Sequence, residues 1–526
     1  METLESYVVG TWHRAPSGFR DLVDPSTGDA VARASSEGVD FAAVLEHART
    51  RGGPALRELT FAQRAALLKE MSKALRERRD ELLDLSRLNT GTTRPDGAFD
   101  VDGGTGTLAY YASVGKGLGD ARMLPEDDGV QLARSEAFWG RHGLVPRPGV
   151  AVCINAFNFP VWGFAEKAAC ALLAGMPVVV KPATATALVA YRAVRTVIDA
   201  GILPEGALQL VCGGTGDLLD RLGPHDVLAF TGSAETAATL QDRTNLRRDN
   251  TRINVEADSL NAAVLAPGGA PGTDGAETAE LFLRDVVREM TQKTGQKCTA
   301  VRRILVPAEA MDRIQEALVE RLGEVVTGNP ADDSVTMGPL ATADQLDDTA
   351  AGVAELARSA RIVHGSGERI DGAGSPSGQG YFFGPTLLRA GDAANAGPVH
   401  RREVFAPVAT LMPYDGDPGR AAEVVALAEG TLVTSVYGDD PDWLGDFLER
   451  VGGCTGRVYV GSSESAAEAP GSGIALPQSL HGGPGRAGGG EELGGLVGVK
   501  RYMQRVAVQG ARPMVDALLS GTSQPA

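Results

Sequence analysis

The chain has 526 residues, enough for two or three structural units, because a single hydrophobic core stops growing near ~250–300 residues. Its 50 basic and 67 acidic residues give a formal net charge of −17, and a field of this sign repels nucleic acid and anionic lipid surfaces. The five cysteines form no Cys-x-x-Cys pair and no Cys/His cluster, so neither a disulfide framework nor a metal site is expected.

The first residues argue against export and against a membrane anchor. Glu2 and Glu5 precede any apolar run, which is the wrong charge for a signal peptide. No stretch reaches the ~18 apolar residues of a membrane helix. We therefore expect a cytoplasmic protein with no membrane or nucleic-acid partner.

A long amphipathic helix is the first element that the pattern predicts. Thr60 and Gln63 have the spacing of a capping box, and apolar residues continue at helical spacing as far as Leu82. Gly91 stands where a C-terminal cap belongs. One helix packed on a core is therefore expected between Thr60 and Gly91.

From residue 149 onward, short apolar runs alternate with helical segments. Strand, crossover helix and strand repeated in this way predict a buried parallel sheet. The expected strands are 149–154, 177–180, 207–211 and 227–230. The expected helices are 162–174, 185–199, 215–222 and 233–241.

A second strand-and-helix unit is expected from 277 to about 475, opened by a helix over 277–291. Segments 128–148 and 497–511 alternate polar and apolar residues and are expected to be extended. The tail after 515 is expected to be frayed.

The order of the chemically suggestive elements carries a resemblance. These elements are Asn158 before Phe-Pro, Lys181, the Phe-Thr-Gly-Ser run 230–233, Glu256, Cys298 and the Glu-Val-Phe-Ala-Pro run 403–407. Together they resemble the aldehyde dehydrogenase superfamily over nearly the whole chain. The stretches 481–496 and 501–505 are similar to one branch of it, the 3,4-dehydroadipyl-CoA semialdehyde dehydrogenases of aerobic benzoate breakdown and the dehydrogenase half of the bifunctional ring-opening protein of phenylacetate breakdown.

Cys298 and Glu256 are the residues best suited to covalent chemistry. Cys298 follows a predicted helix in a glycine-containing loop, and a thiolate there can attack a carbonyl carbon. Glu256 ends a predicted strand, where a side chain faces the cleft of an α/β sheet. An isolated cysteine is usually a packing residue and an isolated glutamate an ion-pair partner. The resemblance implies a nucleophile and a general base instead, although Ala257-Asp258 follows Glu256 where the family commonly has Leu-Gly-Gly.

The amide of Asn158 is expected to stabilise the oxyanion together with the backbone N–H of Cys298. The alternative for an asparagine before Phe-Pro is an Asx-type turn. The proposed catalytic set is therefore Cys298, Glu256 and Asn158.

The cofactor assignment rests on a predicted helix N-terminus and on the resemblance. Gly232 and Ser233 open a helix whose backbone N–H groups can hold a pyrophosphate. In the family a lysine such as Lys181 holds the adenosine ribose, and NAD-preferring members usually carry Glu where this chain has Thr184. A threonine does not repel a 2′-phosphate and offers a hydroxyl, so NADP is expected, with NAD possible. The expected cofactor-binding residues are Phe157, Lys181, Thr184, Gly214, Gly232, Ser233, Glu403 and Phe405.

A glycine-rich run near the C-terminus leaves two interpretations open. Glycines let a backbone approach a ligand closely, so His481, Gly482 and Gly483 are candidate substrate contacts. The same run could be loop architecture alone.

The resemblance implies an α/β fold with a Rossmann-like cofactor domain (1–127 and 149–262), an α/β catalytic domain (263–488), and a β-strand oligomerisation element (128–148 and 489–515), followed by a tail (516–526). It further implies a homodimer or tetramer that oxidises an aldehyde, in this branch a CoA-linked semialdehyde, to the carboxylate through a cysteine thioester. Two alternatives remain. A CoA-acylating dehydrogenase would use free CoA in place of water, although such members commonly lack the Glu256 base, and a pathway scaffold would have a dead site.

Overall fold

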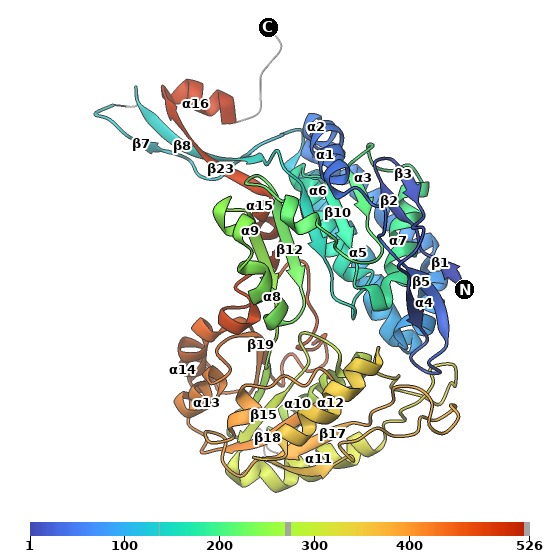
Figure 1. Ribbon diagram of the computed structural model, residues 1–526. Helices are drawn as coiled ribbons and strands as arrows, with labels where there is room; N and C mark the ends of the chain where they lie inside the picture. The colour runs from blue at the N-terminus through green and yellow to red at the C-terminus, as the bar shows by residue number, and fades with distance from the viewer. Residues whose placement is uncertain (136, 269–274, 520–526) are drawn as a thin grey trace.

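The computed structural model describes residues 1–135, 137–268 and 275–519. Two seven-stranded sheets, one from each half of the chain, form the two large units of the molecule, and a β-arm projects from the first (Figure 1). None of the helices in the described ranges combines the length and the apolar character needed to cross a bilayer.

The first sheet has the strand order β13-β12-β9-β10-β11-β2-β3. The five strands from β13 to β11 are parallel, and the β2-β3 hairpin adds an antiparallel edge on the other side. Along the chain β10 and β11 lie on one side of β9, whereas β12 and β13 lie on the other, so the strand order reverses between β9 and β12. Ligands of open α/β sheets bind at such a point, beyond the carboxyl ends of the strands. The bounds are β2 (Ser6–Val8), β3 (Thr11–His13), β9 (Ala151–Ile154), β10 (Val178–Lys181), β11 (Leu208–Leu210), β12 (Val227–Thr231) and β13 (Arg252–Glu256).

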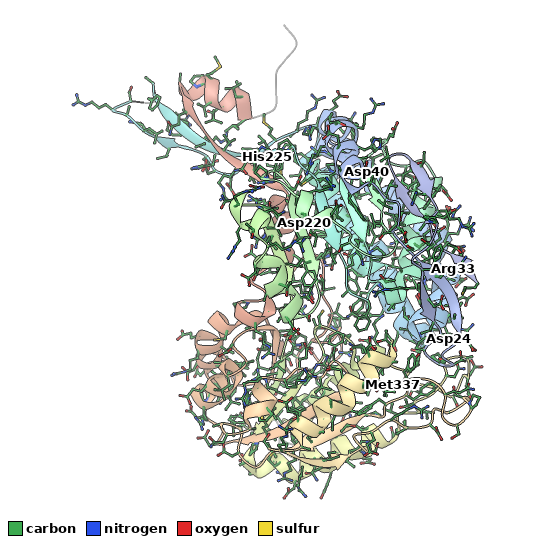
Figure 2. All side chains as sticks on the ribbon, in the orientation of Figure 1. Asp24, Arg33, Asp40, Asp220, His225 and Met337 are labelled. Carbon is green, nitrogen blue, oxygen red and sulfur yellow. The ribbon has the colours of Figure 1, made fainter. Side chains whose placement is uncertain are left out.

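Helices cover both faces of this sheet, because its apolar strands must be buried on both sides. The bounds are α1 (Phe41–His47), α2 (Gly53–Glu58), α3 (Phe61–Glu77), α4 (Arg79–Thr90), α5 (Arg94–Leu118), α6 (Trp162–Ala174), α7 (Ala187–Asp199), α8 (Ala234–Gln241) and α9 (Thr244–Arg248). A small sheet, β1 (Glu2–Thr3), β5 (Ala30–Ala34) and β4 (Arg20–Val23), flanks them. Asp24, at the end of β4, marks where this sheet approaches the second unit (Figure 2), since the next residue, Pro25, accepts a hydrogen bond from the Tyr381 N–H at 2.9 Å.

The second sheet has the order β16-β17-β18-β15-β14-β19-β20 and is parallel except for its β16 edge. Its strands are β14 (Ala262–Leu265), β15 (Arg303–Pro307), β16 (Arg361–His364), β17 (Thr386–Arg389), β18 (Val408–Tyr414), β19 (Thr431–Tyr437) and β20 (Thr455–Gly461). Its helices are α10 (Ala276–Thr291), α11 (Met311–Gly323), α12 (Ala343–Leu356), α13 (Pro418–Ala426) and α14 (Pro441–Val451). A hairpin of β21 (Leu480–Gly482) and β22 (Glu491–Leu493) follows.

Two distant segments build the projecting arm. β8 (Trp139–Pro146) pairs antiparallel with β23 (Met503–Gly510), from Trp139 opposite Gly510 to Pro146 opposite Met503. The short strands β6 (Leu124–Pro125) and β7 (Val130–Gln131) also pair with β8. The remaining helices are α15 (Leu496–Arg501), before β23, and α16 (Arg512–Leu519), after it.

Most predicted elements are confirmed within one or two residues, and Gly91 is the left-handed cap expected of it (φ 67°). The single helix expected after Thr60 is wrong, because Arg78 (φ −105°, ψ 13°) separates α3 from α4. The helix expected over 215–222 is only a 3₁₀ turn, Leu218–Arg221. Gly216, two residues before this turn, has φ 47°, a conformation that an α-helix cannot include.

Two predictions for the C-terminal region are also wrong in part. The extended segment expected over 497–511 begins as helix α15, whose buried Val499 belongs to the core, and becomes extended only at Met503. The tail expected to be frayed after 515 is helical as far as Leu519, because Val515 and Leu519 are buried there. The rest of that prediction, 520–526, lies outside the described residues.

Candidate active site

A cavity of about 580 Å³ lies beyond the carboxyl ends of the first sheet. Asn158, Glu256, Cys298 and His481 line one part of it, although they come from four separated segments of the chain. Another part is lined by residues that follow β10 and β12 and by Glu403 and Phe405. The cavity therefore joins all three predicted catalytic residues to the predicted cofactor residues Phe157, Lys181, Gly232 and Ser233.

A strained turn presents Cys298 to the cavity. After α10, Lys293 (φ 52°), Thr294 (φ 58°) and Gly295 (φ 64°) are all left-handed. For a residue other than glycine such a conformation costs about 1–3 kcal/mol, so packing must hold it in place. The hydroxyl of Thr294 donates to the Gly338 carbonyl at 3.0 Å, and a Cβ on Gly295 would lie 2.4 Å from the Ala406 carbonyl oxygen. The turn thus brings the chain back from the helix toward the cavity.

Asn261, immediately before β14, fixes the other side of the nucleophile loop. Its Nδ2 donates to the carbonyl of Cys298 at 2.8 Å and to that of Ala300 at 2.9 Å. The side chain of Asn261 is fully buried, so these bonds form away from competing water. Asn261 therefore fixes the backbone of Cys298, while the half-buried thiol faces the cavity.

Asn158 lies between β9 and α6, and both sides of its loop are tied down. Its Nδ2 donates to the Gln296 carbonyl at 3.0 Å, which connects it to the Cys298 loop. The carboxylate of Asp100, from α5, accepts the backbone N–H groups of Val161 at 3.2 Å and of Trp162 at 2.8 Å at the start of α6. The side-chain NH₂ of Asn158 carries two hydrogens, so the second remains available to a ligand in the cavity.

Glu256 is buried at the end of β13, opposite Thr231 in the register of β12. Its Oε1 lies 3.1 Å from Nε2 of the equally buried His481. Burial raises the pKa of this carboxyl, but the charge and hydrogen bond of His481, together with Lys167, more than offset it and lower the pKa below its usual range. Glu256 is therefore an anion in the resting site.

Cys298 is in the opposite electrostatic situation. Its Sγ lies 3.7 Å from His481 Nε2, in the same group of side chains as Glu256. Burial raises the pKa of the thiol well above its ordinary value, and the Glu256 carboxylate raises it further. The sulfur therefore requires a neighbouring group to become a thiolate near neutral pH.

Behind Glu256 is a buried charge cluster that the sequence analysis missed. Lys167 Nζ contacts Glu166 Oε1 at 2.9 Å and Glu492 Oε2 at 3.1 Å, and Asn254 Nδ2 donates to Glu492 Oε1 at 3.2 Å. Glu166 also lines the cavity, and burial raises its pKa. The available signal was the Glu-Lys pair inside the otherwise apolar helix α6.

The cofactor part of the cavity contains buried polar side chains that make no hydrogen bond within the described part of the chain. The hydroxyl of Thr231 and the side-chain amide of Asn155 are buried without a hydrogen-bond partner in the described part of the chain, and both residues line the cavity. Ser233 caps α8, but the Asp258 carboxylate accepts the Ala234 N–H at 2.9 Å, so one of the donors expected to hold a pyrophosphate is already used. Unpaired polar groups at the carboxyl ends of β9 and β12 fit a nicotinamide nucleotide.

Glu403 and Phe405 lie at the far side of this region. The ring of Phe405 meets that of Phe157 edge to face, with centroids 5.8 Å apart. Glu403 Oε2 accepts the Ser259 N–H at 3.2 Å. Burial raises the pKa of Glu403 to about 7, against the lowering effect of Arg302.

Four of the predicted binding residues do not line the cavity: Thr184, Gly214, Gly482 and Gly483. The Thr184 hydroxyl donates to the Gly213 carbonyl at 3.2 Å, so it is not the free donor that the sequence suggested. Gly482 and Gly483 pack closely against backbone. A Cβ would lie 2.1 Å from the Gly490 oxygen at Gly482 and 2.3 Å from the Thr431 oxygen at Gly483. Loop architecture accounts for these two glycines, and only His481 of the three faces the cavity.

We expect Gly456→Ala to reduce stability strongly, because its Cβ would lie 1.6 Å from the carbonyl oxygen of Gly482, in the strand that carries His481. Overpacking costs about 1–3 kcal/mol when side chains can adjust, and here the obstacle is backbone, so the loss should reach or exceed ~3 kcal/mol. Chemical denaturation measures it. Gly453→Ala is the matched control, since a Cβ there meets nothing within 4 Å. Equal stability of the two variants would contradict the prediction.

Comparisons with known proteins identify the family of the chain. The model of the aldehyde dehydrogenase family matches residues 12–508. The chain is 44% identical to the 3,4-dehydroadipyl-CoA semialdehyde dehydrogenase of Aromatoleum evansii over 481 residues, which cover 91% of this chain and 93% of the relative.

Solved structures share the fold. A 3,6-anhydro-L-galactose dehydrogenase in complex with NAP has a TM-score of 0.83 at 21% identity, covering 97% of this chain and 100% of that one. The betaine aldehyde dehydrogenase of Staphylococcus aureus in complex with NAD+ has a TM-score of 0.82 at 23% identity, covering 97% and 95%. With the site geometry and the match over nearly its whole length, the chain belongs to the aldehyde dehydrogenase family.

Proposed function

We propose that this aldehyde dehydrogenase oxidises a CoA-linked semialdehyde, 3,4-dehydroadipyl-CoA semialdehyde or a close analogue, to the free carboxylate with NADP as acceptor. The observation that carries the proposal is the convergence of Cys298, Glu256 and Asn158 on one cavity that also reaches Lys181 and Glu403. The substrate class is supported by the name of the relative that is 44% identical, an enzyme of a CoA semialdehyde.

The reaction follows from the positions of the chain's own groups. The sulfur of Cys298 adds to the aldehyde carbon, and the amide of Asn158 with the Cys298 backbone N–H holds the resulting oxyanion. Lys181, Thr231, Ser233 and Glu403 are the groups proposed to hold the nicotinamide nucleotide, which when bound accepts the hydride. Glu256 then removes a proton from the water that attacks the thioester, and the carboxylate product leaves.

The CoA-acylating alternative predicts a different product. Free CoA would replace water and a CoA thioester of the new acid would accumulate. The buried anionic Glu256 beside Cys298 favours water, because it supplies a base where the thioester forms. Mass analysis of the products with and without added CoA distinguishes the two. A new acyl-CoA that forms only when CoA is added would overturn the hydrolytic assignment, and stoichiometric thiol labelling without turnover would indicate a scaffold.

Two neighbouring side chains support NADP over NAD. Thr184 is uncharged, so it does not repel a 2′-phosphate, although its hydroxyl is engaged with Gly213. Strand β4, which begins at Arg20, lies against the turn Thr184–Thr186. Burial lowers the pKa of Lys181, and the positive charge of Arg20 lowers it further, so Arg20 supplies positive potential near this lysine. A cation here favours the nucleotide with the extra phosphate.

We expect NADP to exceed NAD in kcat/KM, and Thr184→Glu to erase or reverse the preference. Two unit charges 4 Å apart repel by about 4 kcal/mol at an effective dielectric near ~20, which is ample for a tenfold change. Thr184→Gln, which matches the size of glutamate without its charge, should keep the preference, and Arg20→Gln should weaken NADP use alone. Wild-type preference for NAD by tenfold or more would show that other residues discriminate.

We propose that the cofactor domain comprises 1–127 and 149–262, the catalytic domain 263–488, and the oligomerisation element 128–148 and 489–515. The arm supports a homodimer or tetramer, because it projects from the subunit (Figure 1) and exposes large apolar side chains that water disfavours. These are Val130, Leu132, Phe138, Val506 and Met514.

A further inference from the structure

The imidazole of His481 lies between the nucleophile and the base. Its Nε2 is 3.1 Å from Glu256 Oε1 and 3.7 Å from Cys298 Sγ. The side chain is 5% exposed and comes from β21, whose backbone is fixed by pairing with β22. This position puts Nε2 within contact of both the sulfur and the carboxylate.

The thiol of Cys298 needs a proton acceptor within contact. Among the described residues, Glu256 and His481 are the two titratable groups that share its cluster. Glu256 is a weak acceptor in this setting, because its pKa is lowered, and the proposed function reserves it for water. A histidine accepts a proton readily near neutral pH and leaves a cation that stabilises the thiolate.

The charges around His481 favour its protonated form. It faces Glu256 from β13, Glu166 from α6, Glu492 from β22, and Cys298 itself. Lys167 of α6 pairs with Glu166 and Glu492. Burial lowers the pKa of His481, but the three carboxylates, Glu256 foremost, outweigh burial and raise it. These carboxylates therefore stabilise the imidazolium that forms when His481 accepts the proton of Cys298.

We propose that His481 is a catalytic residue that takes the proton of Cys298 and remains beside the sulfur as an imidazolium. The inference rests on the proposed function. The S–H bond breaks, its electron pair stays on sulfur, and the proton moves to Nε2. The C–S bond then forms as the carbonyl π pair moves to oxygen. When water later cleaves the thioester, the sulfur leaves with the C–S pair and recovers the proton from Nε2, while Glu256 takes the proton of the water.

This division of labour separates the two half-reactions. His481 serves attack by sulfur, and Glu256 serves hydrolysis, so their variants should fail at different steps. His481→Gln keeps a polar group near Glu256, whereas His481→Phe removes it. If both variants show the same defect, the cause is loss of the base and not loss of the hydrogen bond to Glu256. His225→Gln is the control, since this exposed histidine, labelled in Figure 2, precedes β12 and does not line the cavity.

The test is the pH dependence of Cys298 alkylation by iodoacetamide in the full-length enzyme, followed by mass spectrometry of the Cys298 peptide. Wild type should show an inflection at least one pH unit below that of both His481 variants. Their burst of reduced nucleotide at pH 7 should be at least tenfold slower and should recover as pH rises.

Unchanged inflection and burst rate in a folded His481→Gln would overturn the proposal. A wild-type inflection at or above the ordinary thiol pKa of ~8.5 would do so without any variant. Failure of the wild type to oxidise the semialdehyde would instead reject the proposed function, because alkylation needs no substrate.

Discussion

Cys298→Ala is expected to lower kcat for aldehyde oxidation by more than a hundredfold while nucleotide binding stays near the wild-type value. The reason is that the alanine has no atom to carry the thioester, whereas the cavity walls remain. A hundredfold loss corresponds to about 2.7 kcal/mol of transition-state stabilisation. Steady-state assays measure kcat, and fluorescence titration with the reduced nucleotide measures binding.

Cys454→Ala is the matched control, because this second half-buried cysteine does not line the cavity. It should retain full activity. A Cys298→Ala enzyme that keeps more than about a hundredth of the wild-type kcat would remove Cys298 from the role of nucleophile.

Glu256→Gln is expected to leave a burst of reduced nucleotide of about one equivalent per site but to reduce steady-state turnover by a factor on the order of 10² or more. The glutamine cannot deprotonate water, so the thioester accumulates. It also removes the negative charge that raises the pKa of Cys298, which offsets the loss of the carboxylate that raises the pKa of His481, so the burst should persist. Stopped-flow absorbance measures the burst, and mass spectrometry detects the acylated enzyme.

Glu403→Gln serves as a comparison, since this buried carboxyl lies on the cofactor side of the cavity. It should alter nucleotide affinity without accumulating thioester. If burst and turnover are lost together in a folded Glu256→Gln, the carboxylate activates the thiol, and its assignment to water is wrong.

The parallel sheets could be predicted from sequence because their strands are buried on both faces. Val178–Lys181 and Val227–Thr231 therefore form apolar runs that the intervening helices separate clearly. The helix expected over 215–222 is wrong because a glycine interrupts it. Its apolar residues have helical spacing, but Gly216 has φ 47°, which prevents a helix from beginning there. The sequence does not show which conformation a glycine adopts.

The reactive pair Cys298 and Glu256 could be named from motif order, whereas the contacts around it could not. His481 is 225 residues from Glu256, and Glu492 is 325 residues from Lys167, so no local periodicity reports either contact. Gly482 and Gly483 illustrate a further limit. Close approach of a backbone explains both glycines, but the sequence does not say whether the approaching group is a ligand or the Gly490 and Thr431 carbonyls.

The reactive centre draws Glu256 from the end of one sheet, Cys298 from the loop that enters the other, and His481 from a hairpin that follows both. On the role proposed for His481, a nascent chain holds an unassisted thiol until almost its whole length has been synthesised and its two halves have docked. Reactivity arises at the last stage of maturation, so partially folded molecules carry no activated sulfur with which to modify themselves or their neighbours.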